Sequence, residues 1–445
     1  MSKTYRAWDV DQVWLLPPSV HDFVPAGHPA HLVRDLVREE LDLSAVVADY
    51  EREERGQPPY HPAMMVALLL YAYTQGVYAS RRIAKACEER LDVMAVTGMQ
   101  RPDFRTISDF RKRHLAALSE LFVQVLRLCR QVGLVNLGHV ALDGTKLQAN
   151  ASKHKAMSYG RMQRTEAELA AEVADWLAQA EAADAAEDGE HGPDRRGDEL
   201  PEWVKDKQAR LAKIRAAKAA LEAEAKAEAP PPDAEPGPSS GMTDHGRPAR
   251  APDGGPPARA QRNFTDPDSR VLKTRDGFVQ GYNGQLAVDA AHQIIVAQRL
   301  TTNGSDQDGL VPLLEATQAA LGRKPREASA DAGCCRESNL AALTARRIRG
   351  YLAPGRGRHG SADPSGQRQI RPDSLMARMA AKLKRAGRRS RYRLRKQTVE
   401  PVIGQIKHAR GFRQLLLRGF SKVEAEWALV CTAHNLAKLV AARAA

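Results

Sequence analysis

Two aspartates end short apolar runs that have the residue pattern of β-strands. Asp143 ends the run at 139–143, and Gly144 and Thr145 after it predict a turn. Asp331 ends the run at 327–331 in the same way. Carboxylates at strand ends project from the edge of a sheet. The two positions therefore predict acidic side chains that a ligand can reach.

A third carboxylate, Glu400, opens a segment whose apolar stripe predicts a helix over residues 398–408. Lys407 lies seven residues later, so it shares a helix face with Glu400 at the border of the stripe. Pro401 suits the first turn of a helix, where its missing N–H costs no hydrogen bond. The pattern predicts that both side chains extend past the edge of the sheet on which the helix packs.

Phosphodiester chemistry uses such a set of side chains. Two divalent ions about 3.5–4 Å apart activate the attacking oxygen and stabilise the leaving oxygen. Mg²⁺ takes oxygen ligands, commonly one or two carboxylates together with substrate phosphate, and a nearby lysine neutralises a phosphate oxygen. Each acid taken alone is more often structural, so the assignment depends on the motifs around the three acids.

The positive charge of the chain is concentrated in one block. The chain has 67 Lys and Arg against 54 Asp and Glu, which gives a net charge of +13 and a pI near 9.6. Residues 341–420 contain 21 Lys and Arg against 3 Asp and Glu, a net charge of +18, so the other residues sum to −5. A dense basic block in an otherwise mildly acidic chain predicts a polyanionic partner.

Composition argues against several classes of protein. No apolar run approaches the ~20 residues needed to cross a bilayer, and the first ten residues lack the apolar stretch of a signal peptide. The five cysteines are scattered and form no C-x-x-C motif, which indicates reduced thiols in the cytoplasm. We therefore expect neither a membrane protein nor a secreted disulfide scaffold nor a zinc finger.

Helical and β-type patterns divide the 445 residues into regions. Residues 1–135 predict short helices with exposed cations, which suits a helix-turn-helix-like DNA-binding domain, although a generic helical bundle fits nearly as well. Further β-type runs, at 278–288, 293–301 and 348–353, are interspersed with helical patterns, so we expect a mixed α/β sheet. The exposed cations are expected at Arg81, Arg82, Arg111, Lys112 and Arg113.

The segment between the first strand and the later strands has the composition of an insertion. Residues 151–229 carry two apolar stripes and predict a helical hairpin. Residues 230–262 are rich in Pro, Gly, Ala and charge and predict a disordered linker. Residues 151–230 contain 13 Lys and Arg against 17 Asp and Glu. Because this charge repels DNA, we expect the hairpin to contact protein or to act as a spacer.

Four stretches together resemble the bacterial insertion-sequence transposases of the DDE type. VALDGTKLQANAS is similar to the region of the first catalytic aspartate, and ADAGCC to the second motif. RKQTVEPVIGQIKHARGFRQLLLRG resembles the third motif, Tyr-(2)-Arg-(3)-Glu-(6)-Lys. RGQPPYHPAMMVALLLYAYTQGVYASRRIAKAC resembles the family's opening helices. The resemblance covers most of the chain outside residues 151–262.

The resemblance implies a ribonuclease-H-like catalytic core in residues 136–150 and 263–445, and an N-terminal helical DNA-binding domain in residues 1–135. It implies Mg²⁺, for which Mn²⁺ substitutes, and an enzyme that cleaves the ends of an insertion sequence and joins them to target DNA. The expected partner is double-stranded DNA, bound by a homodimer at the bacterial nucleoid. The implied catalytic residues are Asp143, Asp331, Glu400 and Lys407, of which the three acids are the metal ligands. The expected DNA contacts are Arg111, Lys112, Arg113, Arg395, Lys396 and Lys407.

The third motif departs from the family pattern in two slots. Counting back from Glu400, Lys396 stands in the arginine slot and Arg393 in the tyrosine slot, while Tyr392 and Arg395 are each one residue out of register. Cys334 stands where the second motif has an aromatic residue. Other acids compete with Asp331 for the second catalytic position, namely Asp266, Asp268, Asp289, Asp306 and Asp308.

Two other functions share parts of this pattern. A DNA-binding regulator, or a disabled copy of a transposase, would use the N-terminal helices without catalysis. A nuclease that does not transfer strands would use the same three acids. A protein that only binds DNA has no need of three acids in these contexts, so the sequence favours the enzyme.

Overall fold

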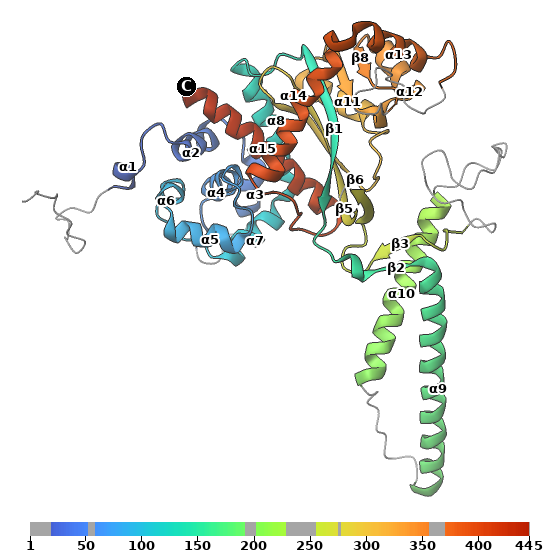
Figure 1. Cartoon of the computed structure of the whole chain (residues 1–445). Coiled ribbons are helices and arrows are strands. Elements are labelled where there is room, and N and C mark those ends of the chain that lie inside the picture. Colours follow the sequence, from blue (N-terminus) through green and yellow to red (C-terminus); the bar gives the residue numbers. More distant parts are fainter. Residues whose placement is uncertain are drawn as a thin grey trace, which may run out of the picture.

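A mixed β-sheet lies at the centre of the molecule, with helices on both of its faces (Figure 1). The computed structural model describes residues 19–51, 58–191, 202–227, 255–274, 277–355 and 370–444. The strand order is β4-β5-β1-β7-β8, and β6 also pairs with β5. The strands are β1 (His139–Gln148), β4 (Arg270–Thr274), β5 (Gly277–Asp289), β6 (Ile295–Thr301), β7 (Glu327–Ala330) and β8 (Arg349–Leu352). The predicted α/β fold, with a ribonuclease-H-like mixed-sheet core and a helical N-terminal region, is confirmed.

Strand β1 is longer than the sequence predicts, and the predicted turn after Asp143 is wrong. The strand continues through Gly144 and Thr145 to Gln148. It is antiparallel to β5 along its length, with Asp143 opposite Leu286 and Gln148 opposite Gly281. Hydrogen bonds from this distant strand keep the chain extended where glycine alone favours a turn.

The first half of β1 also pairs with β7, in parallel. Ala141 lies opposite Ser329, and β8 continues the parallel arrangement beyond β7. Such a parallel pair needs a crossover, and here β5, β6 and helix α11 (Leu310–Leu321) lie between the two strands in the chain. Helices α12 (Glu337–Ala345) and α13 (Leu375–Ala386) lie next to β8 at the far edge (Figure 1).

Helix α14 (Leu394–Gly404) begins four residues earlier than predicted, so Glu400 does not open it. Pro401 therefore lies inside the helix, where it cannot donate to the carbonyl of Gln397. The side chain of Gln293 donates to that carbonyl at 3.1 Å instead. A π-helical turn, Gln405–Ala409, follows α14 and carries Lys407.

The N-terminal helices share one apolar core with the sheet. Helix α4 is buried on all sides, and the last helix, α15 (Phe420–Ala444), packs against α8, α4 and β6. Gly284 of β5 leaves room for the fully buried ring of Trp427, which a Cβ there would meet at 3.0 Å. The helices are α1 (Val20–Phe23), α2 (Pro29–Glu39), α3 (Ser44–Glu51), α4 (Pro62–Thr74), α5 (Ser80–Glu89), α6 (Leu91–Thr97), α7 (Phe104–Arg113) and α8 (Leu115–Gln131).

Helices α9 (Tyr159–His191) and α10 (Glu202–Ala227) form an antiparallel pair that projects from one end of the sheet (Figure 1). They have a small apolar cluster of their own, built around Met162, Leu169 and Ile214, which is separate from the main core. A short ladder of β2 (Ala156–Ser158) and β3 (Gln261–Asn263) forms the base.

The end of the predicted linker is ordered, which corrects its boundary. Residues 255–262 lie next to the start of α9, where Tyr159 N–H donates to the carbonyl of Ala260 at 2.7 Å, and they include part of β3. The rest of the predicted linker lies outside the described residues. Within the described part of the chain, no helix combines the length and apolar character that a membrane span requires.

The separate cluster predicts that the hairpin can be removed without unfolding the core. Ser158 and Gln261 are paired in the β2–β3 ladder, so an Asn-Gly turn can replace residues 159–260 and join them. We expect this variant to melt cooperatively, within a few degrees of the full chain, as measured by circular dichroism. An insoluble or non-cooperative product would show that the hairpin supports the core.

Candidate active site

Asp143 and Asp331 lie side by side where the parallel strands β1 and β7 meet. Ala141 pairs with Ser329 in the ladder of β1 and β7, and the same register two residues further on places Asp143 beside Asp331. Asp331 follows β7 directly and caps a short 3₁₀ helix, accepting from Cys334 N–H at 3.3 Å. Asp143 accepts from Gly144 N–H at 3.0 Å. Two residues that are remote in sequence are therefore neighbours.

Arg395 joins the third acid to this pair. Its guanidinium donates to Asp143 Oδ2 at 2.5 Å and to Glu400 Oε1 at 2.9 Å. Arg395 and Glu400 both belong to α14, five residues apart, so the helix presents both to β1. The Arg395 side chain is 13% exposed and that of Asp143 16%, whereas that of Glu400 is 45% exposed. Glu400 thus lies at the solvent-facing side of the cluster.

The surroundings of Asp143 raise the free-energy cost of its charged form. Burial raises the pKa of Asp143 to about 6, Arg395 opposes this shift, and the charge of Asp331 adds to it. Buried carboxylates are stable as anions only when paired with positive charge. The site therefore favours cations between its acids.

Lys407 contacts β1 close to the acids. Its ammonium donates to Thr145 Oγ1 at 3.1 Å and to the carbonyl of Lys146 at 2.8 Å. Burial, followed by the charge of Arg413, lowers the pKa of Lys407. Thr145 is two residues beyond Asp143 and so lies on the same face of the strand. The structure thus brings Lys407 to the face of β1 that α14 covers.

The donor set fits a hard divalent cation, since it consists of carboxylates. Among the described residues, however, no three acids, histidines or cysteines are close enough to hold one ion as the side chains stand. The guanidinium of Arg395 lies between Asp143 and Glu400. A cation that bound both of these acids would have to displace it.

The shifted third motif is explained by the position of Arg395. This residue, one place out of register, contacts the acids, whereas Lys396 in the expected slot is exposed. Burial raises the pKa of Tyr392, with Arg395 opposing and Asp331 adding to the shift. Tyr392 and Arg395 keep the family's spacing of two intervening residues. The Tyr-Arg unit is therefore intact and displaced by one residue relative to Glu400.

The predicted basic surface of the N-terminal helices needs one correction. Lys112 and Arg113 are exposed as predicted, but Arg111 is buried, with 5% of its surface exposed. Its guanidinium donates to Tyr73 Oη and to the carbonyl of Tyr78, both at 3.0 Å. Arg111 is therefore a core residue, and its assignment as an exposed DNA contact is wrong. Arg111 lies four residues after Ile107, on the apolar face of α7, and this spacing could have predicted that it is buried.

Four of the five competing acids have structural partners elsewhere. Asp266 accepts from Tyr282 Oη and Gly419 N–H, and Asp268 accepts from Phe420 N–H. Asp289 binds the backbone N–H of Leu137, and Asp308 pairs with Arg336 at 2.6 Å. Asp306 is different, because it lies against β1 at Gly144.

Comparisons with known families match both ends of the chain. Residues 18–113 match the family model described as Transposase domain (DUF772), and residues 361–440 match the one described as Transposase DDE domain. The chain carries the domains of a DDE transposase. The second match includes Glu400 and Lys407, while Asp143 and Asp331 lie outside both matches. No curated protein and no solved structure gives a significant match.

Asp306 is the competing acid whose position beside β1 the sequence did not predict. Its Oδ1 accepts from Asn283 Nδ2 at 2.6 Å and Gln285 Nε2 at 3.0 Å, and Lys146 Nζ lies 4.0 Å from Oδ2. Asn283 and Gln285 pair with Lys146 and Gly144 across the β1–β5 ladder, so all of them share the face of β1 opposite Asp143. Asp306 thus packs against β1 on the face opposite Asp143.

Gly144 makes room for Asp306, because a Cβ there would lie 2.1 Å from Asp306 Oδ1. Gly144→Ala should therefore lower the melting temperature of the transposase, with an overpacking cost of about 1–3 kcal/mol. In an Asp306→Ala background the same substitution should cost little. Thermal melts of the four proteins of this cycle measure the coupling. Equal losses in both backgrounds would show that contact with Asp306 does not cause the destabilisation.

The position of Arg395 predicts competition between its guanidinium and a metal ion. Arg395→Gln should bind Mn²⁺ on the order of tenfold more tightly than the wild type in the absence of DNA, because a cation beside two carboxylates is removed. Lys396→Gln is the matched control, since it removes the same charge from an exposed neighbouring position. Isothermal titration calorimetry measures both affinities. Mn²⁺ binding by Arg395→Gln that is no tighter than that of the control would contradict the prediction.

Proposed function

We propose that this transposase cleaves the ends of an insertion sequence and joins the freed 3′-OH groups to target DNA. The observation that carries the proposal is the convergence of Asp143, Asp331 and Glu400. They come from a strand, a strand end and a helix spread over 258 residues of sequence. Asp143 and Glu400 share one arginine, and Asp331 lies beside Asp143. An ordinary structural ion pair needs two of these acids at most.

The proposed cofactor is Mg²⁺, held by Asp143, Asp331 and Glu400. When bound, divalent ions would supply the charge that activates the attacking oxygen and stabilises the leaving oxygen. Arg395 and Lys407 would bind phosphate oxygens and orient the scissile bond. Hydrolysis and strand transfer are both in-line substitutions at phosphorus, so one set of side chains serves both steps. No covalent protein–DNA intermediate is needed.

The proposed partners are the double-stranded DNA of the element's ends and of the target. Lys112, Arg113 and Lys396 are exposed and would bind the DNA backbone, which determines affinity rather than sequence choice. An element has two ends and each chain has one candidate site, so we propose a homodimer that pairs the ends. We place this complex at the bacterial nucleoid in the cytoplasm. The division into a DNA-binding domain at 1–135 and a catalytic domain at 136–150 and 263–445 also remains a proposal.

Single substitutions of the acids test the catalytic assignment. Asp143→Ala, Asp331→Ala and Glu400→Ala should each reduce Mg²⁺-dependent cleavage of DNA carrying the element's end by at least about 10³-fold, since each removes a metal ligand. DNA binding in Ca²⁺ should change little. Asp308→Ala is the control, because Asp308 is an acid near the site that pairs with Arg336 instead. Nicks mapped to the nucleotide, and joined products resolved on gels, measure the two steps.

The outcomes separate the competing functions. Full cleavage by any one of the three variants rejects that residue. Binding without cleavage by the wild type indicates a regulator or a disabled copy. Cleavage without joined products indicates a nuclease that does not transfer strands.

A further inference from the structure

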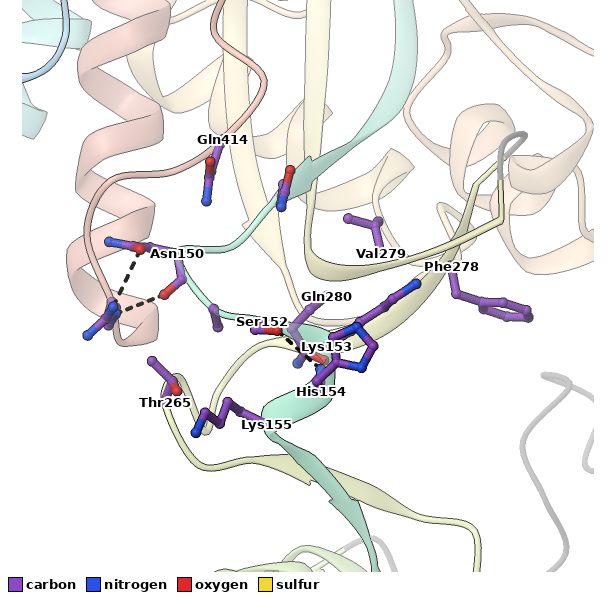
Figure 2. A pocket seen from close by; sticks show the side chains of 13 residues that line it. Asn150, Ser152, Lys153, His154, Lys155, Thr265, Phe278, Val279, Gln280 and Gln414 are labelled. Atoms are coloured by element: carbon purple, nitrogen blue, oxygen red, sulfur yellow. Dashed lines mark hydrogen bonds between the residues drawn. The ribbon is translucent and has the colours of Figure 1, made fainter.

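The structure has a hollow of about 680 Å³ at the end of β1, beyond the candidate active site (Figure 2). Lys153, His154, Lys155 and Arg418 line it, together with several amide side chains, and none of the described lining residues is acidic. Phe278 lies at its rim and is 64% exposed, the most exposed of the large apolar side chains that the structure describes. Cations, amides and an exposed aromatic ring are the groups that bind single nucleic acid strands.

The lysines of this groove are held in place while their side chains remain available. The turn Lys153–Lys155 is anchored at both ends, because Asn263 Nδ2 donates to the carbonyl of Ser152 at 2.8 Å and Phe264 N–H donates to that of Lys155 at 3.0 Å. Both lysines are exposed, and neither has an ion pair within the described part of the chain. A turn with an anchored backbone and exposed lysine ammonium groups is suited to binding phosphates.

A buried acceptor in the wall of the groove lacks a partner. Gln280 is 3% exposed, and its Nε2 donates to Ser269 Oγ at 2.7 Å. The hydroxyl of Ser269 donates to the carbonyl of Asp266, so it must accept from the nitrogen of Gln280, which fixes the orientation of that amide. Gln280 Oε1 has no partner among the described residues. Because this oxygen is fully buried, a donor from a ligand can reach it only if the side chains that cover it move.

Strand β1 connects the candidate active site to the groove. Gln148, the last residue of β1, lies five residues beyond Asp143, a distance of about 17 Å along a strand. The chain that carries Lys407 continues alongside, with Gln148 N–H donating to the carbonyl of Arg413 and Leu415 N–H donating back to Gln148, and it reaches the groove at Arg418. At the ~3.4 Å per nucleotide of a duplex, the distance corresponds to about five nucleotides, and an unpaired, extended strand covers it with fewer.

We propose that this groove binds the DNA strand that leaves the catalytic carboxylates, within about five nucleotides of the cleaved bond. Lys153, Lys155 and Arg418 bind its phosphates, and an unpaired base stacks on Phe278. The inference rests on the proposed function, because it takes the strand to be the same DNA that is cut at Asp143. It adds a second contact region and requires the DNA to be unpaired there.

The salt dependence of binding tests the role of the two lysines. The probe is a labelled duplex of about 40 base pairs that carries the element's end, titrated in Ca²⁺ at increasing KCl. Lys153→Ala/Lys155→Ala should reduce the slope of log affinity against log salt by about 2, one unit for each phosphate that is no longer neutralised. The control, Arg210→Ala/Lys213→Ala, removes two exposed cations from α10 and should leave the slope unchanged. An unchanged slope in the groove variant would overturn the proposal.

Crosslinking tests the binding of a base independently of charge. 5-Iodouracil is placed at successive positions of the strand, and irradiation should link Phe278 to a position within about five nucleotides of the cleaved bond. Phe278→Ala should abolish that crosslink and weaken binding about tenfold or more without changing the salt slope. Crosslinks that map outside the groove would reject the proposal. These binding measurements do not depend on cleavage, so if Asp143→Ala still cleaves while the groove variants lose binding, the catalytic assignment fails and the groove assignment stands.

Discussion

The parallel register of β1 and β7 is the constraint on which the candidate site depends. It places Asp143 beside Asp331, although 187 residues separate them in the chain. Side chains alternate along a strand, so a slip of one residue would turn Asp143 to the opposite face. Two features hold the register: β5 pairs with β1 along its whole length, and the carboxylate of Asp306 fits over Gly144 from the opposite face. The position of β1 is thus fixed by hydrogen bonds to β5 along one edge and by contact with Asp306 on one face.

The electrostatics of the site follow from burying acids at that junction. Asp143 is mostly buried, and its raised pKa expresses the cost of keeping it charged. Helix α14 brings Arg395 and Glu400 together to the same place, so the positive charge arrives on the element that also supplies the third acid. The dense basic block between residues 341 and 420 therefore has two parts: Arg395 and Lys407 face inward to the acids and to β1, while Lys396 faces solvent.

The continuous core connects the N-terminal helices to the catalytic sheet. Helix α15 contacts α4 and α8 on one side and β6 on the other, and Trp427 packs over Gly284 of β5. Arg111 is buried in the same helical region by its hydrogen bonds to Tyr73 and Tyr78. Such packing holds helix α7, which carries the exposed Lys112, against the rest of the core. The α9–α10 pair lies outside this core and has its own cluster.

The sequence alone determined the family, the fold class and the order of the main elements, because motifs and apolar periods are local. It predicted the apolar runs that end at Asp143 and Asp331 and the helix that carries Glu400. Only the tertiary structure decided the rest, since the deciding partners are distant in the chain. Pairing with β5 kept the chain extended past Gly144, and Gln293 satisfied the carbonyl freed by Pro401 inside α14. Local pattern specifies which segments can form, whereas hydrogen bonds and packing between remote segments decide where they end and what their side chains contact.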